Sequence, residues 1–224
     1  MITQTLPLAA VIFDFDGTLA KLNINFAEMK RAILALAADY GVTTAGIETM
    51  HVLEMIEAVR KLLARKGPRR EDRFYADAYA LISAIEIRAA NEGSLLAGIR
   101  DMFAELKKRG IKSGVITRNC GEAVSVIFPD ISSHCDAFIP REHINHVKPH
   151  PEHLLMILKR LQVKPGQAIM VGDHPLDIEA GKNAGVLTAG VLTGNSSREV
   201  LEGAGADYIF NSAAEIIHIM PPQD

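Results

Sequence analysis

The sequence contains no tryptophan and only two cysteines, Cys120 and Cys135, among its 224 residues. Neither cysteine belongs to a Cys-x-x-Cys pair, so nothing predicts a disulfide framework or a thiolate zinc site. Isolated thiols are typical of proteins kept in a reducing compartment. We therefore expect free cysteines and a cytoplasmic location.

Long apolar runs and excess positive charge are also lacking. No stretch approaches the roughly 20 residues of a membrane-spanning helix, and residues 1–10 have neither the basic nor the apolar region of a secretory signal. The 24 Lys and Arg residues are outnumbered by 27 Asp and Glu residues, which gives a net charge of −3. Because binding to nucleic-acid phosphates depends on excess Lys and Arg, we expect no nucleic-acid partner and no membrane partner.

Short apolar segments rich in β-branched residues are present instead, and they are typical of buried parallel strands. Most are separated by stretches with the period of an amphipathic helix. This alternation predicts an α/β fold with a doubly wound, Rossmann-like parallel sheet. The expected strands are residues 9–13, 112–116, 137–139, 168–171, 186–191 and 208–210.

Local patterns predict where some of the core helices lie. Capping-box patterns predict two helix starts near the C-terminus, at Ser196 with Glu199 and at Ser212 with Glu215. Pro151 suits a first helical position. The buried stripe expected after it consists of Leu154, Leu155, Leu158 and Leu161.

One region, from about residue 25 to residue 91, shows helical periodicity and no convincing strand. We therefore expect an α/β core of residues 1–22 and 93–224, with an all-helical cap domain of residues 23–92 inserted after the first strand. A basic run lies at a junction between two cap helices; such a run is usually a solvated face, although some members could select an anionic substrate. It consists of Arg60, Lys61, Arg65, Lys66, Arg69, Arg70 and Arg73.

Acidic residues follow two of the expected strands. Asp14 and Asp16 come after the first strand, and Asp173 and Asp177 come after the strand at 168–171. The carboxyl ends of parallel strands meet at one edge of a sheet, so we expect these four acids to converge there. Any one of them could be a polar turn or a helix cap. Four converging carboxylates are better explained by a hard cation such as Mg²⁺.

Three further residues fit the same edge. Gly17 permits a sharp turn after the first acids. Thr117 ends the strand at 112–116 and offers a hydroxyl donor, and Lys148 lies in a stiff turn next to Pro149. A fixed ammonium group there would balance the charge of a transferring phosphoryl group. A lone Thr or Lys is usually a surface residue, so only their positions relative to the acids give them weight.

In this order and spacing, the motifs resemble those of the haloacid dehalogenase superfamily, and its phosphoglycolate-phosphatase-like members in particular. The resemblance covers residues 8–212, and the helical insertion is similar to the family's small helical cap. The matching motifs are Asp14-Phe15-Asp16-Gly17-Thr18, Thr117, Lys148, and Gly172-Asp173 with Asp177.

The resemblance implies a Mg²⁺-dependent phosphatase that hydrolyses a small phosphorylated metabolite, phosphoglycolate-like or a sugar phosphate, through an aspartyl-phosphate. Asp14 would be the nucleophile and a metal ligand. Asp16 would be the general acid and then the base, with its backbone carbonyl at the metal. The other implied roles are metal ligation by Asp173, support by Asp177, and phosphoryl binding by Thr117 and Lys148.

Asp16 also favours phosphoryl transfer over carbon–halogen cleavage, because halide-displacing relatives typically lack an acid two residues after the nucleophile. Arg118 and Asn119 depart from the family pattern, in which Asn often follows the Thr directly, and His174 departs from the small hydroxyl residue that is common there. Gly17, Arg118 and Asn119 are candidate substrate-binding residues.

Two alternatives stay open: a phosphosugar mutase of the same fold, and a non-enzymatic interaction protein on that scaffold. The sequence does not distinguish a monomer from a homodimer.

Histidines gather in one part of the chain, but we do not expect a zinc site there. No Cys pair accompanies them, and His150 lies between two prolines. The histidines are His134, His143, His146, His150 and His153.

Overall fold

The computed structural model describes residues 8–65 and 68–220, which form two compact units. One unit contains the described residues up to Leu22 and from Gly93 onward, and the other runs from Asn23 to Glu92. In the part of the chain that the structure describes, no helix is both long and apolar enough to cross a bilayer.

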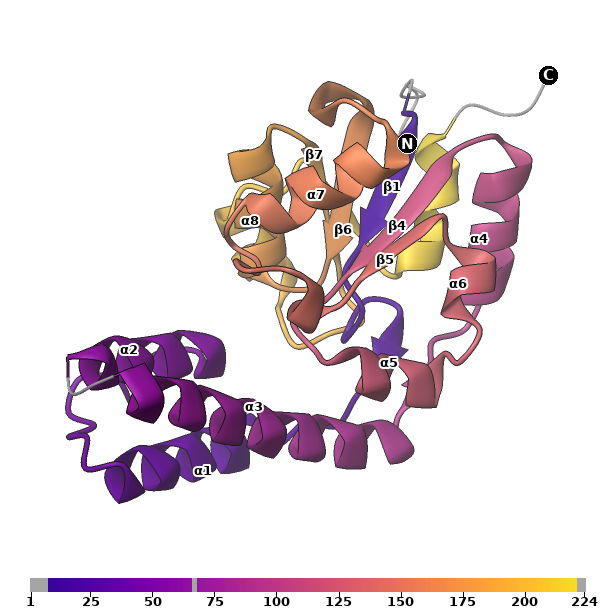
Figure 1. Ribbon diagram of the computed structural model, residues 1–224. Coiled ribbons are helices and arrows are strands. Elements are labelled where there is room, and N and C mark those ends of the chain that lie inside the picture. The colour runs from indigo at the N-terminus through magenta and orange to yellow at the C-terminus, as the bar shows by residue number, and fades with distance from the viewer. Residues whose placement is uncertain (1–7, 66–67, 221–224) are drawn as a thin grey trace. The chain divides into compact units, whose positions relative to one another are not determined.

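A parallel six-stranded sheet forms the centre of the first unit, in the order β5-β4-β1-β6-β7-β8 (Figure 1). Each strand lies within one residue of a segment expected from the sequence, so the α/β, doubly wound fold is confirmed. The strands are β1 (Ala10–Phe13), β4 (Lys112–Ile116), β5 (Ala137–Ile139), β6 (Ala168–Gly172), β7 (Leu187–Val191) and β8 (Tyr208–Phe210).

Helices cover both faces of this sheet because successive strand residues point to opposite sides. Ile12 belongs to the apolar cluster under α7 and α8, whereas the ring of Phe13 packs edge-on against Phe103 of α4, 5.5 Å between centroids. The helices of this unit are α4 (Ile99–Lys108), α5 (Gly121–Ile127), α6 (Ile131–His134), α7 (Glu152–Leu161), α8 (Pro175–Ala184), α9 (Arg198–Gly203), and the 3₁₀ segments η1 (Arg141–His143), η2 (Pro165–Gln167) and η3 (Ala213–Ile219).

Some local predictions in this unit are wrong. Leu155 is exposed, and His153 takes an interior position on α7 because its ring nitrogen finds a backbone carbonyl there. The first expected helix start is shifted by one residue, since the hydroxyl of Ser197 accepts the Val200 N–H; because Val200 has no side-chain acceptor, this cap is not a capping box. In the second, Glu215 accepts bonds from Asn211, and the Ser212 side chain makes no cap bond.

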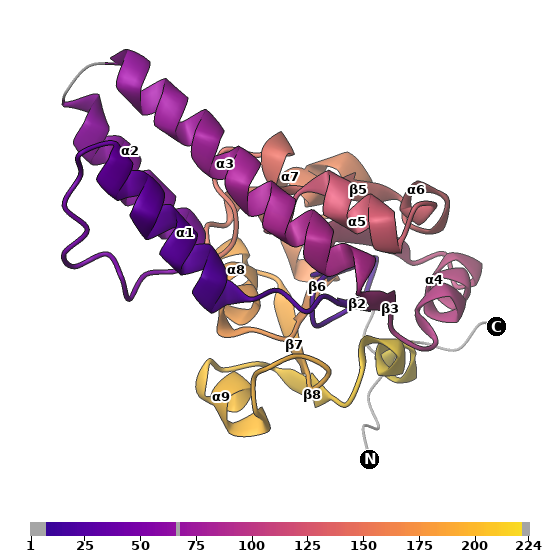
Figure 2. The same ribbon diagram turned by 90° about the horizontal axis from the view of Figure 1, so that it is seen from below.

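The second unit consists of α1 (Phe26–Asp39), α2 (Val52–Ala64) and α3 (Pro68–Asn91), which pack against one another in pairs (Figures 1 and 2). No strand occurs in the described residues 23–65 and 68–92.

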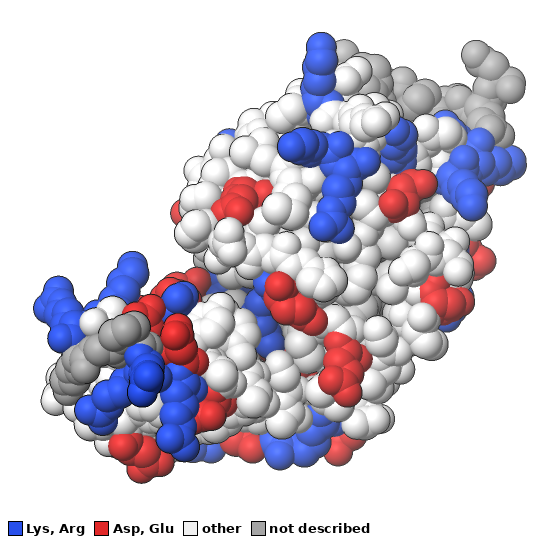
Figure 3. All heavy atoms as spheres, in the orientation of Figure 1, with Lys and Arg blue, Asp and Glu red and all other residues white. Residues whose placement is uncertain are grey.

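Lys and Arg side chains gather around the α2–α3 connection, interleaved with Asp and Glu (Figure 3). Arg60 of this run donates to Glu71 at 2.8 Å and lies over the ring of Tyr75. Arg70 donates to the carbonyl of Tyr40. Lys66 lies outside the described residues. At least part of the run is therefore engaged within the helical unit.

A two-stranded antiparallel ribbon, which the sequence does not predict, lies where the chain leaves the first unit and returns to it. It pairs β2 (Ala20–Lys21) with β3 (Ser94–Leu95). The Leu96 N–H extends the ribbon by donating to the carbonyl of Leu19 at 2.9 Å. Two residues per strand are too few to produce a recognisable alternation.

Candidate active site

Strand register brings the first acids together. Phe13 of β1 is aligned with Val115 of β4 and with Val171 of β6. The Asp14 N–H continues that ladder by donating to the Val171 carbonyl at 2.9 Å. Asp14 and Asp173 therefore leave the carboxyl ends of neighbouring strands. The strand order changes direction at β1, and such a switch point is where open α/β sheets bind ligands.

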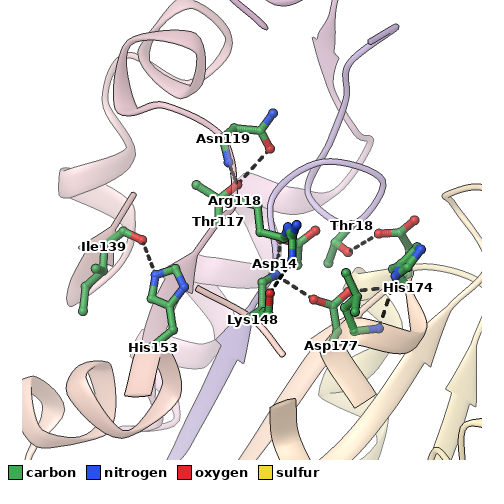
Figure 4. A network of polar contacts seen from close by, with 12 residues as sticks. Asp14, Thr18, Thr117, Arg118, Asn119, Ile139, Lys148, His153, His174 and Asp177 are labelled. Atoms are coloured by element: carbon green, nitrogen blue, oxygen red, sulfur yellow. Dashed lines mark hydrogen bonds and ion pairs between the residues drawn. The ribbon is translucent and has the colours of Figure 1, made fainter. Parts of the chain in front are cut away.

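Lys148 reaches this edge from the loop before α7 and bridges two carboxylates (Figure 4). Its ammonium nitrogen contacts Oδ1 of Asp14 and lies 2.6 Å from Oδ1 of Asp177. Lys148 is 1% exposed. The other oxygen of Asp177 accepts the N–H of His174 at 3.1 Å, as part of the capping of α8. Asp177 is thus both a helix cap and a partner of Lys148.

The site holds more buried negative charge than Lys148 can balance. Burial raises the pKa of Asp14 to about 6; Lys148 opposes this rise and Asp177 adds to it. Burial also raises the pKa of Asp173 to about 8, and the charge of Asp14 adds to the effect. Burial opposes the charge on Lys148, but its two carboxylate partners outweigh it and raise the Lys148 pKa.

The same acids fit a hard cation. Carboxylate oxygens of Asp14, Asp173 and Asp177 lie within 4.8 Å of one another. An all-oxygen donor set suits Mg²⁺ rather than a softer transition ion. Burial, and then repulsion among the acids, raises the pKa values of Asp14 and Asp173, and a bound cation would oppose both effects by favouring the ionised forms.

Two glycines make room for Asp173. A Cβ atom at Gly17, whose φ is +79°, would lie 2.5 Å from Oδ2 of Asp173, and one at Gly194 would lie 1.8 Å from the same atom. The hydroxyl of Thr193 donates to the Gly17 carbonyl at 2.6 Å and ties the two loops together. Thr193 and Gly194 are not among the residues predicted for the site, although their position after the strand at 186–191 places them at the same edge.

Asp16 lies at the start of the turn beyond Asp14. Its Oδ1 accepts the Leu22 N–H at 2.9 Å, and the Gly17 N–H donates to the Ala20 carbonyl at 2.8 Å. The charge of Asp16 contributes to the raised pKa of Asp173, after burial and the charges of the two other acids. Asp16 is thus near enough to Asp173 for their charges to interact, but its carboxylate is held by the Leu22 N–H and is not one of the three that converge.

Thr117 is fully buried beside Asn119. Its hydroxyl donates to the Asn119 side-chain oxygen at 3.0 Å and accepts the Asn119 N–H at 3.1 Å (Figure 4). Asn119 therefore orients the hydroxyl of Thr117, which the sequence predicts at this edge of the sheet.

Arg118 is engaged with the Lys148 loop. Its guanidinium donates to the Lys148 carbonyl at 2.5 Å, and its own carbonyl accepts from Arg141 at 2.8 Å. Asn183 of α8 donates to the neighbouring Pro149 carbonyl at 3.3 Å. Arg118 thus holds the Lys148 backbone directly, while Arg141 holds the backbone of Arg118 and Asn183 holds the next residue of the loop. The sequence gives no signal for the contributions of Arg141 and Asn183.

His153 and the two cysteines lie outside this cluster. His153 contacts the Ile139 carbonyl through Nε2 at 2.9 Å, and burial lowers its pKa to about 3, so the ring is neutral. Cys120 and Cys135 are buried free thiols, and burial raises the pKa of Cys135 to about 12.

Comparison with known proteins agrees with the fold and the motifs. A family model described as haloacid dehalogenase-like hydrolase matches residues 11–191. The pyrophosphatase PpaX of Bacillus cereus is 36% identical over 94% of this chain and 95% of its own.

Solved structures give the same fold. A predicted phosphoglycolate phosphatase from Haemophilus somnus superposes with a TM-score of 0.64 at 18% identity, covering 95% of this chain and 98% of its own. The β-phosphoglucomutase of Clostridium difficile gives a TM-score of 0.64 at 21% identity, with 93% of each chain covered.

Proposed function

The chain belongs to the haloacid dehalogenase-like hydrolases and is a phosphatase-type hydrolase, and we propose that it is a Mg²⁺-dependent phosphatase that transfers a phosphoryl group through Asp14. The observation that carries the proposal is the buried contact of Asp14 with Lys148 beside Asp173. This contact keeps a carboxylate oriented and a cation fixed where a phosphoryl group would be attacked. Residues 23–92 would serve as the cap domain.

The acid cluster would hold Mg²⁺ mainly through Asp14 and Asp173, because both oxygens of Asp177 are already hydrogen-bonded. When bound, the ion would neutralise charge on the phosphoryl oxygens and on the attacking carboxylate. Asp177 would instead position the ammonium group of Lys148.

In the first step, a carboxylate oxygen of Asp14 would attack phosphorus and the bond to the leaving oxygen would break. Asp16 would give that oxygen its proton. Lys148 and the Thr117 hydroxyl would hold the phosphoryl oxygens. The hydroxyl proton must then turn from Asn119 toward the substrate.

In the second step, water would attack the aspartyl-phosphate. Asp16, now ionised, would take a proton from that water, which is the reverse of its first role. Inorganic phosphate and free Asp14 would result. Covalent catalysis divides a very slow hydrolysis into two easier displacements.

The substrate is proposed to be a small phosphate compound. A phosphorylated metabolite fits the motif resemblance, whereas the PpaX relative is named a pyrophosphatase and favours pyrophosphate as a second candidate. The two differ in the leaving group, which is an alcohol oxygen in one case and a phosphate oxygen in the other.

A panel assay tests the proposal. Phosphoglycolate, several sugar phosphates and pyrophosphate are incubated with Mg²⁺, and inorganic phosphate release is measured alongside chromatography of the sugar phosphates. We expect Mg²⁺-dependent phosphate release from at least one member and none from the Asp14→Asn variant. Isomerised sugar phosphate without net release would show a mutase, and release that persists in the variant would remove Asp14 from the reaction.

A further inference from the structure

A second group of metal-ligating side chains lies in the segment that carries Lys148, among the histidines for which the sequence alone did not predict a zinc site. Ligand atoms of His146, His150 and Glu152 lie within 4.8 Å of one another. Nδ1 of His146 is 2.5 Å from Oε2 of Glu152, and Nδ1 of His150 is 4.0 Å from the same oxygen. The two imidazole rings pack with their centroids 4.6 Å apart. Both rings thus converge on one carboxylate oxygen.

We propose that these three residues form a binding site for a borderline divalent transition ion such as Zn²⁺. Two imidazoles and one carboxylate are a donor set that Zn²⁺ takes in proteins with three side-chain ligands. Imidazole nitrogen does not suit Mg²⁺, which prefers oxygen, so the site differs in chemistry from the acid cluster around Asp14. On binding, the ion would take the place of the proton that lies between Nδ1 of His146 and Oε2 of Glu152, and that proton would be released to solvent.

The geometry allows an ion to enter and leaves it a coordination position for water. The side chains of His146 and His150 are 62% and 53% exposed, and that of Glu152 is 30% exposed. Ligand atoms around a tetrahedral Zn²⁺ lie about 3.4 Å apart, given bonds of roughly 2.0–2.1 Å. To reach that spacing, Nδ1 of His146 and Oε2 of Glu152 must move apart from 2.5 Å, and Nδ1 of His150 must approach from 4.0 Å. Nδ1 of His150 must also release the Glu152 N–H that donates to it at 3.2 Å.

Binding would have a structural consequence for the catalytic segment. The ligands lie on both sides of Lys148 in the sequence, and Glu152 is the first residue of α7. An ion held by all three would cross-link the loop to the helix. The loop backbone is otherwise held through carbonyls, by Arg118 at Lys148 and by Asn183 at Pro149. Zn²⁺ would therefore restrain the loop that presents Lys148.

Equilibrium dialysis against Zn²⁺ in excess Mg²⁺ tests the site, because Mg²⁺ competes for the acid cluster. We expect His146→Ala and His150→Ala each to weaken the binding of one ion at least tenfold relative to the wild type, and Glu152→Gln to weaken it as well. His143→Ala is the matched control, since this exposed histidine lies outside the cluster, and its affinity should equal that of the wild type. Equal affinity in all variants would overturn the proposal.

Two further readouts do not depend on turnover. In thermal unfolding with Mg²⁺ present, Zn²⁺ should raise the Tm of the wild type by several degrees more than that of His146→Ala, because a ligand that binds only the folded state stabilises it. In the wild type alone, Zn²⁺ should protect His146 and His150 from diethyl pyrocarbonate, measured by mass spectrometry, and leave His143 reactive. Unprotected His146 and His150 at saturating Zn²⁺ would refute the site even if a variant failed to fold.

Discussion

Replacement of Lys148 by Met tests the electrostatic design of the site. Met has a similar length but carries no charge, so the substitution keeps most of the packing of a side chain that is 1% exposed. It removes the ammonium group from contact with Asp14 and Asp177. The two carboxylates then lose their shared cation while both stay buried.

The expected loss of folding stability follows from the burial of these two carboxylates. Removing one partner of a buried ion pair destabilises a protein by about 3–5 kcal/mol, since the remaining charge is left uncompensated. The Asp14 pKa, already raised to about 6 by burial, must rise further because Lys148 lowers it. A larger fraction of Asp14 is then protonated at neutral pH, and a protonated carboxyl is a poor nucleophile. Stability and turnover should both fall.

The assay is urea unfolding in EDTA of the wild type, Lys148→Met, Asp177→Asn and the double variant. EDTA prevents a divalent cation from replacing the missing ammonium group. The double variant should be more stable than the sum of the single losses predicts, with a coupling energy of about 1–3 kcal/mol, because contacting residues do not act additively. A Lys148→Met loss below about 1 kcal/mol, or strict additivity, would refute the reasoning.

Three further predictions concern neighbouring residues. Gly194→Ala should reduce turnover at least tenfold and raise the Mg²⁺ concentration required, because the added Cβ would displace the Asp173 carboxylate. Gly166→Ala is the control: a Cβ added there would meet no atom within 4 Å, so this variant should match the wild type in the same kinetic assay. Arg118→Ala should reduce kcat equally for phosphoglycolate and p-nitrophenyl phosphate, because Arg118 bonds to the Lys148 carbonyl and not to the substrate. A larger loss for phosphoglycolate would show that Arg118 binds the substrate carboxylate directly. Without metal, unfolding free energy should fall between pH 6 and 8, by up to about 1.4 kcal/mol per pH unit. The reason is that burial raises the pKa of Asp173 from 3.8 to about 8 in the folded protein, so the folded state keeps a proton that the unfolded chain has already released, and this stabilisation is lost as the pH rises toward 8. Mg²⁺ should remove this decline in urea titrations at each pH, and a pH-independent metal-free stability would contradict the shift.

Much of the sheet and of its catalytic edge can be predicted from the sequence. Buried parallel strands are nearly continuous apolar runs, so β1 and β6 are recognisable locally. The rule that ligands bind at the carboxyl ends of strands then places Asp14 and Asp173 together without any distance information. Lys148 is different, because it reaches the edge from a loop: the proline turn makes it a candidate cation, but no strand end places it at the site, and the family resemblance strengthened the assignment.

The remaining features depend on contacts between distant residues. The steric need for Gly194 arises from Asp173, more than twenty residues earlier in the chain. Arg118 bonds to the Lys148 carbonyl, but an arginine at this position could equally contact a substrate, and the residue type alone does not distinguish the two roles. His153 is buried, whereas Leu155 was expected to be, because the Ile139 carbonyl gives the His153 ring a hydrogen-bond partner. Helical periodicity carries no information about such a partner on a distant strand.

The central claim is that Asp14 carries the phosphoryl group, and trapping that group tests it most directly. The enzyme is mixed with Mg²⁺ and its best substrate from the panel, quenched in acid within one turnover, digested, and analysed by mass spectrometry with fragmentation that separates Asp14 from Asp16. We predict one phosphoryl group on Asp14 that appears before inorganic phosphate and disappears as phosphate forms, and none in Asp14→Asn. A modified residue other than Asp14, or turnover with no protein-bound phosphate at any quench time, would contradict the account.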